Sequence, residues 1–156
     1  MRKLFLLLAV LVLPSSELAA AAKPKGCLTT AEIQAEQEIR HGVFLREAAS
    51  RCDVEYTKGT RQSWDTFYTQ AAPRFAKAKD KRIKAWQREF PDNWQRALTT
   101  ADGRVVTYHR NYPLSGAYCQ SVEDLVQAVT KKGYAGFSKQ ANTIQNEVIG
   151  DYKVCR

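Results

Sequence analysis

The four cysteines and the segment between the first two constrain the fold of this chain more than any other feature. The cysteines are Cys27, Cys52, Cys119 and Cys155. The segment between the first two contains no proline, and Thr29 with Glu32 has the spacing of a capping box at the start of a helix. One continuous helix would hold Cys27 and Cys52 about 37 Å apart, whereas a disulfide needs Cα atoms within roughly 7 Å of each other. These two cysteines therefore cannot pair with each other unless the helix folds back at Gly42.

The N-terminus has the layout of a secretory signal peptide. Arg2 and Lys3 precede an unbroken apolar run over residues 4–13, and a stretch of small residues follows at 19–22. The apolar run is well short of the roughly 20 residues that a membrane-spanning helix needs, so a membrane anchor is the weaker alternative. We predict a signal peptide at 1–22, a single helical domain at 23–156, and a periplasmic or secreted protein with no transmembrane segment in the mature chain.

Export bears on both the cysteines and the charge. An even number of cysteines in an exported chain predicts two disulfides, and metal binding is disfavoured because the chain has no C-x-x-C pair and only two histidines. The whole chain has 24 basic and 16 acidic residues. Without Arg2, Lys3 and Glu17, 22 basic and 15 acidic residues remain, a net charge of +7. Such a charge favours an acidic partner.

Apolar residues from 64 to 90 recur at the spacing of one helix face. They are Trp64, Phe67, Tyr68, Ala71, Phe75, Ala78, Ile83, Trp86 and Phe90. Pro73 lies inside this series, and it would remove one backbone hydrogen bond. Because the series keeps its phase across Pro73, we predict one kinked helix rather than two helices.

Residues 92–112 allow two interpretations. Asp102-Gly103 followed by a β-favouring run indicates a hairpin. The alternative is a helix, because apolar residues recur three and four apart across the same glycine: Trp94, Leu98, Ala101, Val105, Tyr108 and Tyr112. We favour the helix.

Two shorter helices follow. Ser121 with Asp124 indicates the start of one, and Gly133 its end. Ser138 indicates the start of the last, whose inward residues would be Ala141, Ile144 and Val148.

The predicted fold is therefore all-α, an antiparallel helical bundle of about five helices braced by two disulfides. With the helical interpretation of 92–112, the order of the helices pairs Cys52 with Cys119 and Cys27 with Cys155.

The chain resembles a family of small exported bacterial helical proteins with four cysteines. The resemblance is carried by "CLT" opening an acidic helix, a second cysteine closing it, an aromatic-rich helix, "SGAYC" before a Val/Leu-rich helix, and a last cysteine near the C-terminus. It implies a helical, disulfide-bonded, periplasmic protein and no catalytic residues. The chain departs from the pattern around Asp102-Gly103.

The residues offer little support for an enzyme. Glu38 and His41 have the i, i+3 spacing of a carboxylate-histidine metal motif, but the further ligands of such a site are missing, so we expect both on the surface. No serine lies in a G-x-S-x-G elbow, and the cysteines are expected to be paired. We expect no catalytic residue, metal or cofactor.

The best candidate contact surface is a row of basic residues in the second helix. We call it the basic ridge: Arg74, Lys77, Lys81, Lys84 and Arg88. At about 100° per residue, the ridge would lie directly opposite Phe75, Ile83, Trp86 and Phe90, which would point into the bundle. Aromatic groups that face inward cannot stack with bases, so nucleic acid is a poor candidate partner.

These observations predict an exported binding or accessory protein whose basic ridge contacts an acidic envelope component or an acidic protein. Peripheral contact with a membrane surface is compatible with the ridge, but insertion is disfavoured because the core needs the apolar face. The alternatives are a ridge that only solvates its helix, as in a structural or stress-related envelope protein without a specific ligand, and a hydrolase acting on envelope polymers.

Overall fold

The computed structural model describes residues 23–24 and 26–155, so the expected signal peptide lies outside the described residues. The helices are α1 (Thr30–Glu55), α2 (Thr60–Glu89), α3 (Trp94–Asn111), α4 (Gly116–Ile144) and α5 (Glu147–Asp151). Two short strands, β1 (Cys27–Leu28) and β2 (Lys153–Val154), pair in parallel and join the two ends of this part of the chain. The all-α prediction is confirmed, while the strand pair was not predicted.

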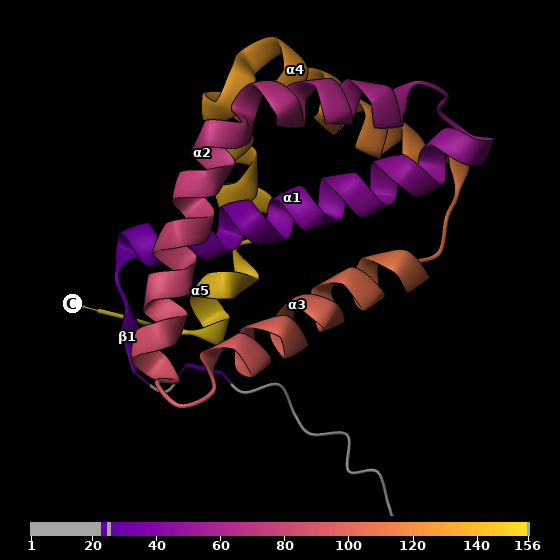
Figure 1. Ribbon diagram of the computed structural model, residues 1–156. Helices are drawn as coiled ribbons and strands as arrows, with labels where there is room; N and C mark the ends of the chain where they lie inside the picture. Colours follow the sequence, from indigo (N-terminus) through magenta and orange to yellow (C-terminus); the bar gives the residue numbers. More distant parts are fainter. Residues whose placement is uncertain (1–22, 25, 156) are drawn as a thin grey trace, which may run out of the picture.

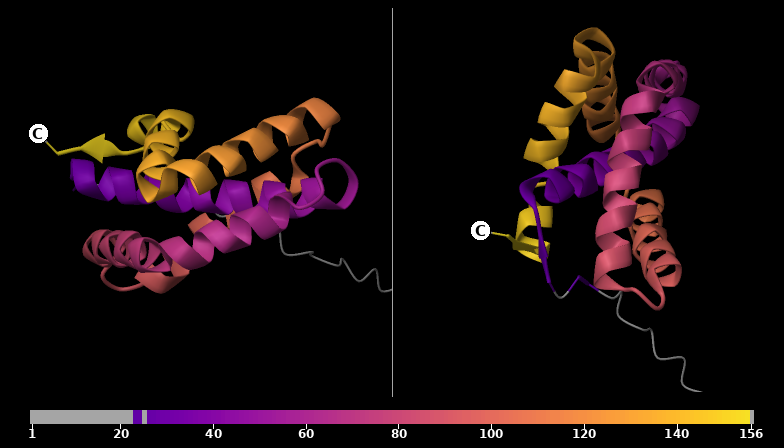
Figure 2. Two further views of the ribbon diagram at one scale, coloured as in Figure 1. Left: turned by 90° about the horizontal axis from the view of Figure 1, so that it is seen from above. Right: turned by 60° about the vertical axis from the view of Figure 1, so that its left-hand side comes forward.

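Helix α1 is the central element of the bundle. Thr29 and Glu32 form the expected capping box at its start. Helices α2, α3, α4 and α5 all contact α1, which runs between α4 and α2 when seen from above (Figure 2, left). The residues that α1 buries therefore face several neighbours rather than one, which explains why polar as well as apolar residues are buried along it.

Helix α2 bends part-way along its length (Figure 1), and Pro73 lies inside it. Proline removes a backbone hydrogen bond and crowds the preceding turn, so a kink is its expected effect. The predicted kinked helix is therefore confirmed. The bend divides α2 into a first arm and a second arm, which carry residues 60–72 and 74–89.

Residues 94–111 are helical, so the hairpin alternative is wrong. In α3, all of whose residues are described, only Ala97 is buried. Tyr108 and Tyr112, expected on the inward face, are 62% and 39% exposed. The helix lies on the surface of the bundle along α1 (Figure 1), and apart from Ala97 its inward side chains are half-buried.

Helix α4 starts earlier than predicted. Ser115, not Ser121, caps it by accepting a hydrogen bond from the Tyr118 amide. Gly133 interrupts the helix as expected, with φ 64° and ψ −163°. The chain resumes its helix directly after this break, so Ser138 lies inside a helix and does not start one.

The residues expected to face inward near the end of the chain divide in two. Ala141 and Val148 are buried, whereas Ile144, at the end of α4, is 38% exposed. The prediction for Ile144 is therefore wrong.

The apolar core has two parts that are separated along α1. The larger joins α1, α4, the first arm of α2 and the start of its second arm; its largest side chains are Trp64, Phe67, Phe75 and Phe137. The smaller joins Leu28, Ile33, Ala85, Val148 and Tyr152 at the start of α1. Between them, buried charged groups connect α1 to the second arm of α2.

Both predicted disulfides are present, Cys27–Cys155 and Cys52–Cys119. The first lies beside the β1–β2 pair, and the second joins the end of α1 to the start of α4. Of the helices in the described part of the chain, none has the length and apolar character needed to cross a membrane.

Candidate functional site: the basic face of the second arm

The structure places the whole basic ridge on one helix and at the surface. All five residues lie on the second arm of α2, beyond Pro73, and all five are exposed. Their environments differ, however, and the differences decide which of them can meet a partner.

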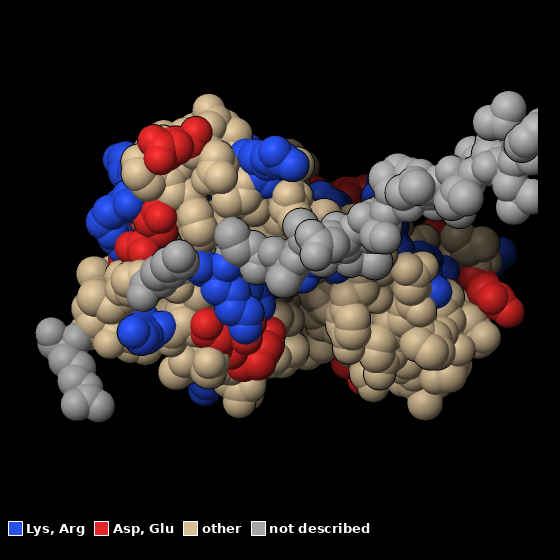
Figure 3. All heavy atoms as spheres, turned by 90° about the horizontal axis from the view of Figure 1, so that it is seen from below, with Lys and Arg blue, Asp and Glu red and all other residues tan. Residues whose placement is uncertain are grey.

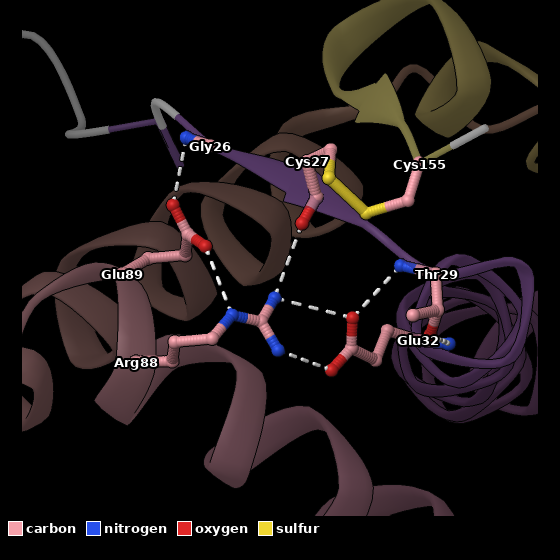
Figure 4. The surroundings of a disulfide bond; sticks show 7 residues. All are labelled: Gly26, Cys27, Thr29, Glu32, Arg88, Glu89 and Cys155. Atoms are coloured by element: carbon pink, nitrogen blue, oxygen red, sulfur yellow. Dashed lines mark hydrogen bonds and ion pairs between the residues drawn. A yellow bond between two sulfur atoms is a disulfide. The ribbon is translucent and has the colours of Figure 1, made fainter.

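Arg88 is fully engaged in contacts with residues near the start of α1 and in β1. Its guanidinium group lies 2.7 Å from a Glu32 carboxylate oxygen, contacts Glu89, and donates a hydrogen bond to the Cys27 carbonyl beside the Cys27–Cys155 disulfide (Figure 4). The hydrogen bond from Arg88 holds the pKa of Glu32 below its ordinary value. Glu89 in turn accepts a hydrogen bond from the Gly26 amide. Arg88 therefore fastens β1 to α2 and is not a free contact residue.

Lys84 forms a weaker ion pair within its own helix. Its ammonium group lies 2.9 Å from Asp80, one turn earlier, and both side chains are largely exposed. An exposed i, i+4 pair of this kind contributes about 0.3–0.5 kcal/mol and is screened by salt. Lys84 can therefore exchange Asp80 for an external acidic group, although the local charge is already balanced.

The other three residues have no such compensation. Within residues 23–24 and 26–155, neither an ion pair nor a hydrogen bond engages the side chain of Arg74, Lys77 or Lys81. We call these three the unpaired ridge. They are spaced three and four apart on one helix, so their charges lie along one side of the second arm.

The unpaired ridge flanks the buried face rather than lying opposite it. In the second arm the buried residues are Phe75, Ala78, Arg82, Ala85 and Trp86, whereas Ile83 and Phe90 are half-buried. At about 100° per residue, the centre of the ridge lies roughly 110° around the helix from the centre of these buried positions. The ridge is still opposite the four apolar residues named in the prediction, but those four do not all point into the bundle. The prediction is wrong for Ile83 and Phe90, because Ala78, Arg82 and Ala85 face α1 in their place.

Arg82 is a basic residue of this helix that the sequence did not distinguish from its neighbours. It is 4% exposed and forms an ion pair with Glu36, which is 1% exposed, and with Asp102 of α3. The indole of Trp86 donates a hydrogen bond to the same Glu36 carboxylate. Arg82 follows Phe75 and Ala78 at the spacing of the buried stripe, and this spacing was the signal that could have identified it.

The charges around Glu36 fix the second arm in place. Burial alone would raise the pKa of Glu36, but the guanidinium groups of Arg82 and Arg40 outweigh that effect and hold it below its ordinary value. Arg40 also contacts Asp151 of α5 and the hydroxyl of Tyr152. Removing one member of such a buried group leaves an uncompensated charge. The ridge is therefore presented by an arm whose inner side is tied by Arg82 to α1 and α3.

Glu38 and His41 are buried, not on the surface as expected. Glu38 accepts a hydrogen bond from the Tyr134 hydroxyl at 2.7 Å, and a His41 ring nitrogen lies 3.1 Å from the Gln140 side-chain oxygen. Burial lowers the pKa of His41 to about 4, so the imidazole is neutral at physiological pH. Among the described residues, no group of three or more His, Cys, Asp or Glu side chains could hold a metal ion. The two residues connect α1 with α4.

A groove of about 510 Å³ runs between α1 and α2 on the other side of α2 from the ridge. Its α2 wall spans both arms and includes Trp64, Tyr68, Ala72, Phe75 and Ala76. Tyr68 was expected to be buried and is 48% exposed, because its ring forms a wall of the groove rather than part of the core.

A smaller crevice lies between α3 and the junction of α1 with α4 and α5. Tyr108 and His109 line it from α3, Tyr112 from the residue directly after α3, and Tyr118 from α4. The sequence predicted neither hollow, since each is assembled from segments far apart in the chain.

Charge is distributed unevenly over the molecule. On the face seen from below in Figure 1, basic and acidic groups alternate over the atoms that the picture describes (Figure 3). In the second arm of α2, by contrast, Arg74, Lys77 and Lys81 form no ion pair within the described residues, and Asp80 between them pairs with Lys84. The unpaired ridge is therefore a local excess of positive charge on the second arm of α2.

Comparison of the chain with protein-family models, with curated proteins and with solved structures finds no match.

Proposed function

We propose that the protein is an exported binding or accessory protein, and that the unpaired ridge docks on an acidic surface of the cell envelope or of a protein partner. The observation that carries this proposal is the absence of internal acidic partners for Arg74, Lys77 and Lys81 in the described part of the chain. A helix face that only needs to be solvated does not require several charged residues of the same sign. The other two residues of the ridge, Lys84 and Arg88, are paired with carboxylates of the same chain.

The rigidity of the second arm supports the proposal. Arg82 ties the inner side of the arm to Glu36 and Asp102, and Arg88 ties its end to Glu32. The backbone that carries these cations is already ordered, so binding a partner costs little further conformational entropy of the backbone. More of the electrostatic attraction then remains in the net binding free energy. The net positive charge of the expected mature chain would also steer the protein toward acidic surfaces.

The test is co-sedimentation of the mature protein with isolated cell envelopes over a salt series. We expect binding at about 0.05 M salt and release above about 0.3 M, where the Debye length falls to several Å. The variant Lys77→Glu/Lys81→Glu should remain in solution at every salt concentration. This variant leaves Lys84 and Arg88 untouched, because their ion pairs belong to the fold.

A matched control separates the position of the charge from its amount. Lys131→Glu/Lys139→Glu makes the same change of charge at two exposed positions of α4. If both double variants lose binding equally, only net charge matters and the ridge is not a docking surface. If neither the parent nor the control sediments at low salt, the ridge does not dock on the envelope and the proposal is wrong.

A further inference from the structure

We propose that the groove between α1 and α2 binds a single-chain anionic amphiphile, with the apolar chain in the groove and the acidic head against the rim. This site is independent of the proposed function, because the groove and the ridge lie on roughly opposite sides of α2. One site can therefore be shown or refuted without the other.

The walls of the groove have the chemistry of an apolar ligand site. Trp64 and Phe75 form part of the wall and are nearly inaccessible, while Tyr68 lies over them with its ring centroid 4.8 Å from that of Phe75. Ile39 and Val43 supply aliphatic surface from α1. A volume of about 510 Å³ lies within the range of roughly 300–1,000 Å³ that is typical of ligand pockets.

Small residues keep the groove open. Ala72 and Ala76 lie one turn apart on α2, both line the groove, and both are exposed. A longer apolar side chain at either position would fill the groove, and an unoccupied apolar hollow of this size leaves aromatic surface in contact with water. The exposure of Tyr68 is the visible sign of that contact.

The charge of the rim selects the head group. Lys79 lies at the rim and has no ion-pair or hydrogen-bond partner within the described residues. Arg46 lies at the rim as well, and it shares the single Glu47 carboxylate with Arg110. Asp65, the acidic residue of the lining, is paired with Arg61. The rim is therefore positive, which complements a carboxylate or a phosphate monoester and disfavours a cationic head.

The experiment uses 11-(dansylamino)undecanoic acid as the probe, with energy transfer from tryptophan as the signal, because Trp64 forms part of the groove wall. Unlabelled decanoate, dodecanoate and tetradecanoate then displace the probe, all below their critical micelle concentrations. We expect saturable binding, and affinity that rises by about two- to fourfold for each added methylene until the groove is filled.

Two variants locate the site. Ala72→Leu/Ala76→Leu should weaken binding by about tenfold or more, since it fills the groove from exposed positions that the core does not use. Ala135→Leu, at an exposed alanine of α4, is the control for added apolar surface and should bind as the parent does. Lys79→Gln should weaken the acidic probe by about two- to fivefold and leave its neutral amide analogue unchanged.

Three results would contradict binding of an anionic amphiphile in the groove. The proposal is wrong if the parent shows no saturable binding. It is also wrong if Ala72→Leu/Ala76→Leu, shown to be folded by circular dichroism, binds the probe with the same affinity as the parent. A displacement series that does not depend on chain length would also overturn it. Lys77→Glu/Lys81→Glu should bind the probe as the parent does, so failure at the groove and failure at the ridge are distinguishable.

Discussion

His41 shows how one buried residue ties stability to pH. It has no exposed surface and lies against Phe44 and Phe137, and among the described residues its Nδ1 has no hydrogen-bond partner. The ring is therefore held in its neutral form, because a charged imidazolium would lose its hydration without gaining an acidic partner. His41 contributes to packing between α1 and α4 only while it remains unprotonated.

We predict that the free energy of unfolding falls as the pH is lowered through the range in which His41 titrates. Burial lowers the pKa of His41 from 6.5 to about 4. Between these two pH values His41 is therefore protonated in the unfolded chain and neutral in the folded protein. Stability is then present at pH 7 and is lost toward pH 4, and the loss between pH 7 and pH 5 should be about 2 kcal/mol. Urea unfolding at both pH values measures it.

The control for this prediction is His41→Gln, which cannot titrate and can still bond to Gln140. Burial also lowers the pKa of His109, so part of the pH dependence should survive in the variant. A variant that loses as much stability as the parent between the two pH values would show that His41 is not the source.

At the scale of the element, α2 and α4 are each interrupted, but by different residues and mechanisms. In α2, Pro73 removes one hydrogen bond while the helix continues. In α4, Gly133 leaves the helical region altogether, with a positive φ and an extended ψ that are essentially restricted to glycine. The kink lets α2 contribute to both parts of the core, with Phe67 in the larger part and Ala85 in the smaller part. Helix α4 contributes to the larger part from both sides of its break, with Val129 before Gly133 and Phe137 after it.

We predict opposite effects for two glycine substitutions in helices. Gly133→Ala should lower the free energy of unfolding by about 1–3 kcal/mol, because its backbone conformation excludes a side chain even though no atom lies within 4 Å of the position of a Cβ. Gly103→Ala, in α3, also meets no atom and has an ordinary helical backbone, so it should raise stability by about 0.5–1 kcal/mol. Chemical unfolding of both variants beside the parent measures the difference, and equal effects would contradict the backbone argument.

At the scale of the whole molecule, the two disulfides have different roles and different environments. Cys52–Cys119 lies inside the larger core, and both residues have no exposed surface. Cys27–Cys155 spans 128 residues and closes the chain beside β1 and β2, where Cys27 is exposed. Arg88 and Lys23 add ion pairs at the same end, to Glu32 and Asp151.

We predict that a mild reductant opens Cys27–Cys155 before Cys52–Cys119 while the protein remains folded. Thiol–disulfide exchange requires access of the attacking thiolate to sulfur, and only the first pair offers it. Alkylation and mass spectrometry over a dithiothreitol time course should find label at Cys27 and Cys155 first. Simultaneous labelling of all four cysteines would mean that the bundle unfolds as one unit before either bond is reduced.

Loss of Cys27–Cys155 alone should cost about 2–5 kcal/mol of stability, because the unfolded chain gains the freedom that the long loop had removed. A double Cys27→Ser/Cys155→Ser variant provides the comparison by urea unfolding. A variant as stable as the parent would show that the ion pairs and strands close this end without the bond.

Much of this architecture was determined by the sequence alone. The capping box at Thr29, the kink at Pro73 and the break at Gly133 depend on local properties of the chain, and the sequence predicted all three correctly. The disulfide pairing followed as well: the length of the first helix excluded a bond between Cys27 and Cys52, and the predicted order of the helices chose between the two remaining pairings. The helix starts predicted at Ser121 and Ser138 are wrong, because both serines lie inside α4.

Only the tertiary structure decided which charges are free. Lys81 and Arg82 are adjacent basic residues, yet one is exposed without a partner and the other is buried against Glu36 and Asp102 from two other helices. The same holds for Tyr68, which became a groove wall because of where α1 crosses α2. Burial and ion pairing depend on distances between segments far apart in the chain, and those distances are set only when the helices pack.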